Sequence, residues 1–174
     1  MLGSAPAWAQ RPWSDAELRR GTLSFDGKAT LGDFAGTTST LRGQLRGGAA
    51  LADVRGWVEA PVNTLKTGND RRDRDLIKTL EASIYPTIRF QLEGVNAEWE
   101  RGDSASVILE GDFFIHGVQR RERFPAVVAR TSNGVRVTAS LPMNLHDYKV
   151  DKLTRFLGML KMKPDIEVHI DVTF

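Results

Sequence analysis

The sequence predicts an all-β protein, an antiparallel sandwich or barrel of about eight strands. Apolar residues recur at every second position over most of the chain, which is the spacing of half-buried strands. Turn-forming residues separate these segments, and two segments depart from the alternation. The length of 174 residues suits a single all-β domain.

The strands follow from their alternation, in chain order. Leu23 and Phe25 open the series. Each of the next segments places apolar or small residues on one face and polar residues on the other: 39–46, 54–62, 88–93, 107–115, 124–128 and 135–141. The last segment is the clearest, with one apolar face made of Ile166, Val168, Ile170, Val172 and Phe174.

Turns and helices complete the pattern. Asn133-Gly134 predicts a hairpin because both positions tolerate positive φ, and Arg101-Gly102-Asp103 predicts a second turn. Residues 70–80 predict a short helix, with Asn69 or Asp70 as its N-cap. A second helix is expected over residues 151–161, ended by Pro164.

Composition excludes several classes of protein. Apolar residues make up 41% of the chain and charged residues 26%, as in ordinary soluble domains. The 24 basic and 22 acidic side chains nearly balance, so no nucleic-acid surface is predicted. No apolar run is long enough for a transmembrane segment. Without cysteine, the chain can form neither disulfides nor thiolate zinc sites.

The first residues have the form of the end of a secretion signal. Ala7, Trp8 and Ala9 give the small-x-small pattern of a signal-peptidase site. We interpret residues 1–9 as a signal-peptide remnant, or alternatively as a disordered tail, and residues 10–174 as one domain. The pattern predicts export from the cytoplasm.

Glycines on the apolar faces leave two interpretations open. Gly43, Gly56 and Gly111 lie among inward-facing apolar residues. Either their small size leaves room for a ligand inside the barrel, or they ease strand bending and larger residues opposite fill the space.

Three groups of residues occur in the order and at the spacing of a known family. They are Thr67, Gly68, Asn69, Arg72, Asp73 and Leu76; then Tyr85, Pro86, Thr87, Ile88 and Phe90; and then Gly111, Ile115, Gly117, Val118 and Arg120. In these residues the chain resembles the YceI-like proteins, also described as polyisoprenoid-binding and lipocalin-like. The resemblance implies an extended lipocalin-like antiparallel β-barrel with one or two short helices. It also implies a periplasmic or secreted bacterial protein that holds a long-chain amphiphile.

The resemblance and the strand faces together predict a ligand tunnel. Its expected wall consists of Phe25, Leu41, Val58, Phe90, Leu109, Phe113, Val137 and Ile170, with Leu153 and Phe156 of the second helix at one end. Arg72, Asp73 and Tyr85 are candidates for contacts with a polar head group at the mouth. The favoured alternative is local: Asp73 caps the helix, and Arg72 ties its loop to the barrel.

The predicted function is non-covalent binding, and transport or storage, of an isoprenoid or quinone-like lipid, with no cofactor, metal or catalysis. No nucleophile elbow and no H-E-x-x-H motif occur. His116 and His169 are expected on solvent-exposed faces. Three alternatives stay open: a carrier of fatty acids or amide-type lipids, an enzyme acting on an isoprenoid lipid, and an interaction module with a filled barrel. A homodimer is compatible with each.

Overall fold

The computed structural model describes residues 11–151 and 161–174. The predicted signal remnant lies outside this part of the chain. So do Leu153 and Phe156, together with the body of the second predicted helix. Within the described residues, no helix is both long enough and apolar enough to cross a membrane.

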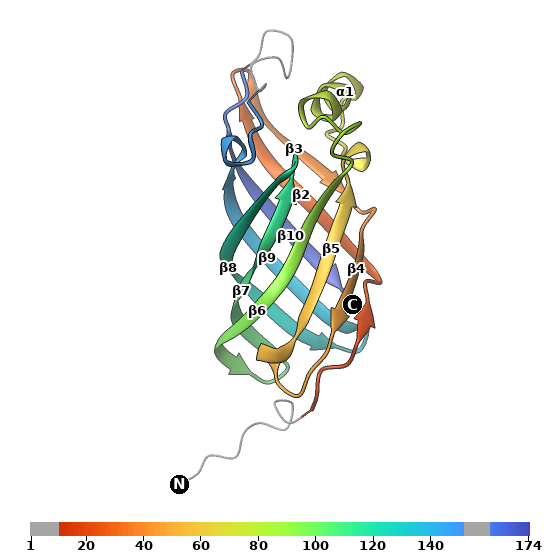
Figure 1. Cartoon of the computed structure of the whole chain (residues 1–174), viewed down its shortest axis with the longest axis vertical. Helices are drawn as coiled ribbons and strands as arrows, with labels where there is room; N and C mark the ends of the chain where they lie inside the picture. Colours follow the sequence, from red (N-terminus) through yellow and green to blue (C-terminus); the bar gives the residue numbers. More distant parts are fainter. Residues whose placement is uncertain (1–10, 152–160) are drawn as a thin grey trace.

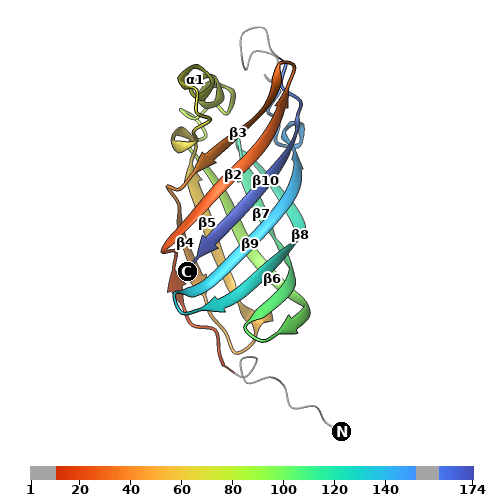
Figure 2. The ribbon, with the colours of Figure 1, turned by 180° about the vertical axis from the view of Figure 1, so that it is seen from behind.

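The predicted all-β fold is confirmed. The strands are β1 (Ala16–Glu17), β2 (Arg20–Ala29), β3 (Gly32–Thr38), β4 (Arg42–Arg46), β5 (Arg55–Pro61), β6 (Thr87–Arg101), β7 (Ser104–Ile115), β8 (Val118–Thr131), β9 (Gly134–Asn144) and β10 (Asp165–Thr173). They form one antiparallel sheet that curls round an interior axis, as Figures 1 and 2 show from opposite sides. Besides the strands there are one helix, α1 (Asp70–Thr79), and the 3-10 turns η1 (Leu51–Asp53), η2 (Val62–Thr64) and η3 (Leu145–Tyr148), among the described residues.

The sheet closes into a barrel because its first strand, formed by β1 and β2 together, pairs with a strand on each side. β1 pairs with β4, placing Ala16 opposite Leu45, while β2 pairs with β10 on one side and β3 on the other. The β2–β3 pairs, such as Leu23 with Thr38, keep the register of the β1–β4 pairs. β1 and β2 are therefore two halves of one strand, and β3 and β4 are two halves of the next. Counted this way, the described residues form an eight-membered barrel, in line with the predicted number of strands.

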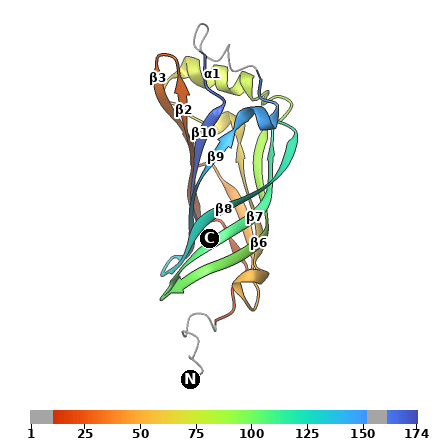
Figure 3. The same cartoon turned by 90° about the vertical axis from the view of Figure 1, so that its left-hand side faces the viewer.

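Helix α1 covers one end of the barrel, opposite the end where residue 11 begins (Figures 1 and 3). The predicted cap is present, since the Asn69 side chain accepts a hydrogen bond from the backbone N–H of Arg72. Leu76 and Leu80 are buried and face the barrel interior. The sequence prediction for this helix is confirmed.

The two predicted turns both form, with one difference in detail. Gly102 has a positive φ of 58°, as expected between β6 and β7. In the β8–β9 hairpin Thr131 pairs with Gly134, so Ser132 and Asn133 are the loop residues. Gly134 takes the positive φ (120°), whereas Asn133 does not. The Asn-Gly pair therefore predicted the hairpin correctly, but the predicted loop lies one residue later in the chain than the observed loop.

Large rings occupy the space beside the inward glycines. A Cβ atom on Gly111 would lie 2.5 Å from Cζ of Phe90, and one on Gly36 would lie 2.3 Å from Cε1 of Phe25. The rings of Phe90, Phe113 and Phe124 then pack together, with centroid separations between 4.7 and 5.9 Å. At these positions the structure supports the interpretation in which neighbouring residues fill the space left by glycine.

Candidate functional site

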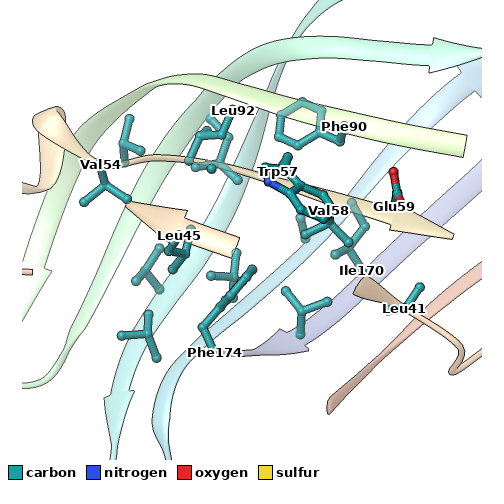
Figure 4. Close-up of a pocket in the computed structure, with 18 of the residues that line it drawn as sticks. Leu41, Leu45, Val54, Trp57, Val58, Glu59, Phe90, Leu92, Ile170 and Phe174 are labelled. Atoms are coloured by element: carbon teal, nitrogen blue, oxygen red, sulfur yellow. The ribbon is translucent and has the colours of Figure 1, made fainter. Parts of the chain in front are cut away.

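The barrel interior contains a cavity of about 100 Å³ near the N-terminal end. Its walls come from β2, β4, β5, β6, β7, β8, β9 and β10, and Figure 4 shows the labelled side chains Leu45, Val54, Leu92 and Phe174 gathered around it. Among the described residues of this wall, Glu59 is the one with an ionisable side chain, and its carboxylate pairs with Arg42 at 2.8 Å and Arg89 at 3.4 Å. The cavity therefore offers an apolar surface and no unpaired charge.

A second cavity, of about 70 Å³, lies toward α1. Leu76 of α1 and Leu80, the C-cap of this helix, form part of its wall, together with Leu145 of η3 and Met162. Leu23, Ile88 and Phe113 line both cavities, so the two meet at these residues. The interior is thus mostly apolar but narrow, and these three side chains lie where its two cavities meet.

All described members of the predicted wall line one of these cavities. The first cavity is lined by Leu41, Val58, Phe90, Leu109, Phe113, Val137 and Ile170. Phe25 and Phe113 line the second. Strand parity placed these side chains on the interior, because alternate residues of a strand face opposite sides of the sheet. That they contact a ligand stays a prediction.

The sequence reasoning did not name several lining residues. Leu92, Val128, Val172 and Phe174 were recognised as apolar-face residues but not as part of the wall, although their parity is the same. Trp13 and Leu51 had no such signal. Trp13 precedes the first strand, and Leu51 lies in η1, where the alternation is absent.

Trp13 closes the N-terminal end of the cavity. Its backbone exchanges two hydrogen bonds with Gly48, at 2.8 and 2.9 Å. The guanidinium of Arg130 stacks on the outer side of the indole ring, 3.8 Å from its centroid, and donates to the carbonyl oxygen of Arg11. Burial lowers the pKa of Arg130, with the charge of Arg11 adding to the effect.

The candidates for the polar mouth make local contacts. Asp73 accepts hydrogen bonds from the backbone N–H of Thr67 at 2.8 Å and from its hydroxyl at 2.6 Å. Arg72 donates to the carbonyl oxygen of Thr67 and stacks 5.0 Å from the ring centroid of Phe34. These contacts agree with the favoured alternative for Arg72, which ties its loop to the barrel. The helix cap, however, is Asn69, so Asp73 holds the preceding turn instead.

The charge of Asp73 is stabilised despite its burial. Burial acts to raise the pKa of this carboxyl, but the hydrogen bonds from Thr67 and the nearby charge of Lys66 outweigh it. The pKa of Asp73 is therefore held below its ordinary value.

The expected exposure of His116 is wrong. Its side chain is only 9% exposed, because its ring, in the turn after β7, packs within hydrogen-bond distance of the Glu81 carboxylate and the carbonyl oxygen of Tyr148. The residue has a positive φ of 52°. The Tyr85 ring packs against it with a centroid separation of 4.9 Å. Tyr85 thus covers this turn, and whether it also touches a head group stays a prediction. His169, 38% exposed, is on the surface as expected.

Comparison with known proteins identifies the fold. A family model described as the YceI-like domain matches residues 16–174. A polyisoprenoid-binding domain from Saccharophagus degradans is 16% identical and superposes with a TM-score of 0.76, covering 92% of this chain and 97% of its own. BcnA from Burkholderia cenocepacia is 15% identical with a TM-score of 0.73, covering 88% and 96%. None of the curated proteins compared with this chain matches it.

Proposed function

This chain belongs to the YceI-like family, and from that premise we propose that it binds a long-chain isoprenoid, or a similar amphiphilic lipid, non-covalently inside its barrel. The binding would allow the protein to carry or store the lipid in an aqueous compartment such as the periplasm. The observation that carries the proposal is the interior itself, which is lined mostly by apolar side chains and carries no unpaired charge among the residues that the structure describes.

The chemistry of this lining favours a hydrocarbon chain. Burying one methylene group contributes roughly 0.8 kcal/mol, so a prenyl chain of several units offsets the roughly 4–15 kcal/mol that association costs. A charged ligand would lose its hydration without gaining a partner in the cavity. The solved relative from Saccharophagus degradans, described as a polyisoprenoid binding domain, supports the isoprenoid class.

Binding requires the walls to move. The cavities of about 100 and 70 Å³ are smaller than the roughly 300–1,000 Å³ of typical small-molecule sites. Phe113 lines both cavities, and its ring packs against that of Phe90 with a centroid separation of 4.7 Å. Rotation of these rings would join the two cavities into one channel.

The experiment is extraction of the purified protein with organic solvent, followed by mass spectrometry. An isoprenoid alcohol or quinone at about one molecule per protein supports the proposal. A fatty acid or amide-type lipid instead would identify the same fold as a carrier of another class. Turnover of the extracted lipid on prolonged incubation would favour the enzyme interpretation.

Two neighbouring valines on β8 give a matched control. Val128 is 5% exposed and lines the first cavity, while Val127 is 42% exposed on the outer face. Val128→Phe fills the cavity and should remove the bound lipid, whereas Val127→Phe should leave the lipid content of the wild type. Equal lipid content in the two folded variants would contradict binding in the interior.

A further inference from the structure

The wall of the barrel is interrupted in one hairpin. The strand formed by β1 and β2 pairs with the strand formed by β3 and β4 at both ends but not in the middle. The last contact on the N-terminal side is the hydrogen bond from the N–H of Leu18 to the carbonyl oxygen of Gly43. Pairing resumes only at Leu23 and Thr38. Residues 19–22 and 39–42 therefore face each other without ladder pairs.

Local hydrogen bonds explain the interruption. The N–H of Leu41 donates to the carbonyl oxygen of Ser39, and the N–H of Thr40 donates to the Thr38 hydroxyl. Backbone donors that a ladder would use are thus turned back onto their own segment. On the opposite strand, the N–H of Arg19 donates to Thr173 of the neighbouring strand β10.

The interruption borders the first cavity. Leu41 lies within it, is partly exposed, and also lines the cavity. Leu23, at the edge of the interruption, lines the same cavity. So does Ile170 of β10, which pairs with Leu23. Figure 4 shows Leu41 and Ile170 near each other at the margin of the pocket. Apolar side chains therefore connect the outer surface with the interior at this point.

Both ends of the barrel are covered by packed residues. Trp13, under the Arg130 guanidinium, covers the N-terminal end. Leu76 of α1 and the C-cap residue Leu80 cover the other end. To pass through either end, a lipid would have to displace a buried element, whereas at the interrupted hairpin no backbone hydrogen bond between the strands has to break.

We propose that this interruption is a side opening through which the lipid enters and leaves, with Leu41 as the side chain that covers it. The inference rests on the proposed function. The opening is held at both margins, on one side by the Leu18–Gly43 hydrogen bond. On the other side the β2–β3 ladder resumes at Leu23 and Thr38. β3 is itself held to the segment after η2, because the Thr38 and Thr64 hydroxyls are hydrogen-bonded at 2.7 Å and Thr37 and Lys66 exchange two backbone hydrogen bonds. The two strands can therefore part between the margins without loss of the barrel.

Cross-linking across the opening tests this directly, because the chain has no cysteine of its own. Thr22 and Ser39 are exposed and face each other across the interruption by the register of the hairpin. The variant T22C/S39C would be joined by a short bis-methanethiosulfonate reagent that reductant removes. The control K28C/D33C places the same cross-link on the same face of the same hairpin, where the strands are already paired.

The measurement is the rate at which anthraniloyl-labelled geranylgeraniol moves from vesicles into the protein. Cross-linked T22C/S39C should take up the probe at about one tenth of the rate of the uncross-linked variant or more slowly still. The rate should recover on reduction, and cross-linked K28C/D33C should not show this slowing. An unchanged rate in cross-linked T22C/S39C would overturn the side opening. Because equilibrium binding of the probe is measured in the same samples, a protein that binds no probe at all would instead contradict the proposed function.

A second variant does not depend on cross-linking. Leu41→Ala removes the covering side chain and should speed both uptake and release of the probe by about threefold. Val127→Phe, on the opposite wall and outer face, serves as control. Unchanged exchange in a folded Leu41→Ala protein would argue against a covering role for Leu41.

Discussion

His116 Nε2 lies 2.6 Å from the Glu81 carboxylate, while its Nδ1 lies 3.0 Å from the carbonyl oxygen of Tyr148. Because a carbonyl oxygen only accepts, Nδ1 is the donor to Tyr148, and Nε2 faces the Glu81 carboxylate. His116 thereby joins three elements at the α1 end of the barrel: the residue that follows α1, the β7–β8 turn and η3. Glu81 itself has a positive φ of 48°, so the backbone on both sides of this contact is unusual.

Replacing His116 should therefore lower stability. Asparagine tolerates the positive φ of this position, so His116→Asn removes the ring contacts without adding backbone strain. We expect a loss of about 2 kcal/mol in the free energy of unfolding, because two partners in a mostly buried site lose their hydrogen bonds. Urea unfolding followed by circular dichroism measures it. His169→Asn removes the more exposed pair with Asp26 and should cost less than about 1 kcal/mol; equal losses would contradict the joining role.

Acid should destabilise the protein in part through Asp73. Its pKa is lower in the folded state than in the unfolded chain, so the folded state binds fewer protons at acid pH. The resulting stabilisation is complete above the unfolded pKa of about 3.9 and is lost as the pH falls through the lower folded value.

Asp73→Asn should remove this contribution. We expect the variant to be less stable than the wild type at neutral pH by about 2 kcal/mol, and the difference to shrink in acid. Unfolding free energies measured between neutral and strongly acid pH would show it. If the difference were independent of pH, the charge of Asp73 would not contribute to stability.

The inward glycines give a prediction on packing. A Cβ atom at Gly111 would lie 2.3 Å from the carbonyl oxygen of Gln91 and 2.5 Å from Phe90. Gly111→Ala should therefore destabilise by about 2 kcal/mol or more, because both the backbone and the ring must shift. At Gly94, on the adjacent strand, the nearest atom would be 3.9 Å away, so Gly94→Ala should change stability little. Thermal unfolding measures the stability of the two variants, and similar melting temperatures would contradict this prediction.

The stacking of Arg130 on Trp13 gives a prediction for the N-terminal end. Arg130→Lys keeps the charge but loses the planar contact with the indole, which should cost about 1 kcal/mol. Arg136→Lys, at an exposed pair with Asp171, should cost less than about 0.5 kcal/mol. Chemical unfolding at fixed pH measures both. A larger loss in Arg136→Lys would show that stacking is not what holds this end.

The strand faces could be predicted from the sequence because alternation is a local property. Phe90, Phe113 and Ile170 lie on three different strands, yet each was placed on the interior by parity alone. Parity does not measure how far a side chain reaches across the barrel. The packing of the Phe90, Phe113 and Phe124 rings inside the barrel therefore could not be predicted.

Features that depend on residues distant in sequence could not be predicted, because alternation is a local property. The burial of His116 depends on Glu81 and Tyr148, which are far from it in sequence. The interruption near Leu41 results from hydrogen bonds within residues 38–41, in a segment whose apolar alternation reads as an unbroken strand. Trp13 closes the cavity from a segment with no strand pattern at all.

The pairing of β2 with β10 joins segments from opposite ends of the chain, while the other strands pair mainly with their sequence neighbours. On a ribosome, most hairpins of this protein can form as they emerge, but the barrel must wait for β10. Until then the apolar interior is open to water along a free strand edge, where it can bind other chains. The nascent protein should therefore depend on a holding chaperone until its last strand has been synthesised.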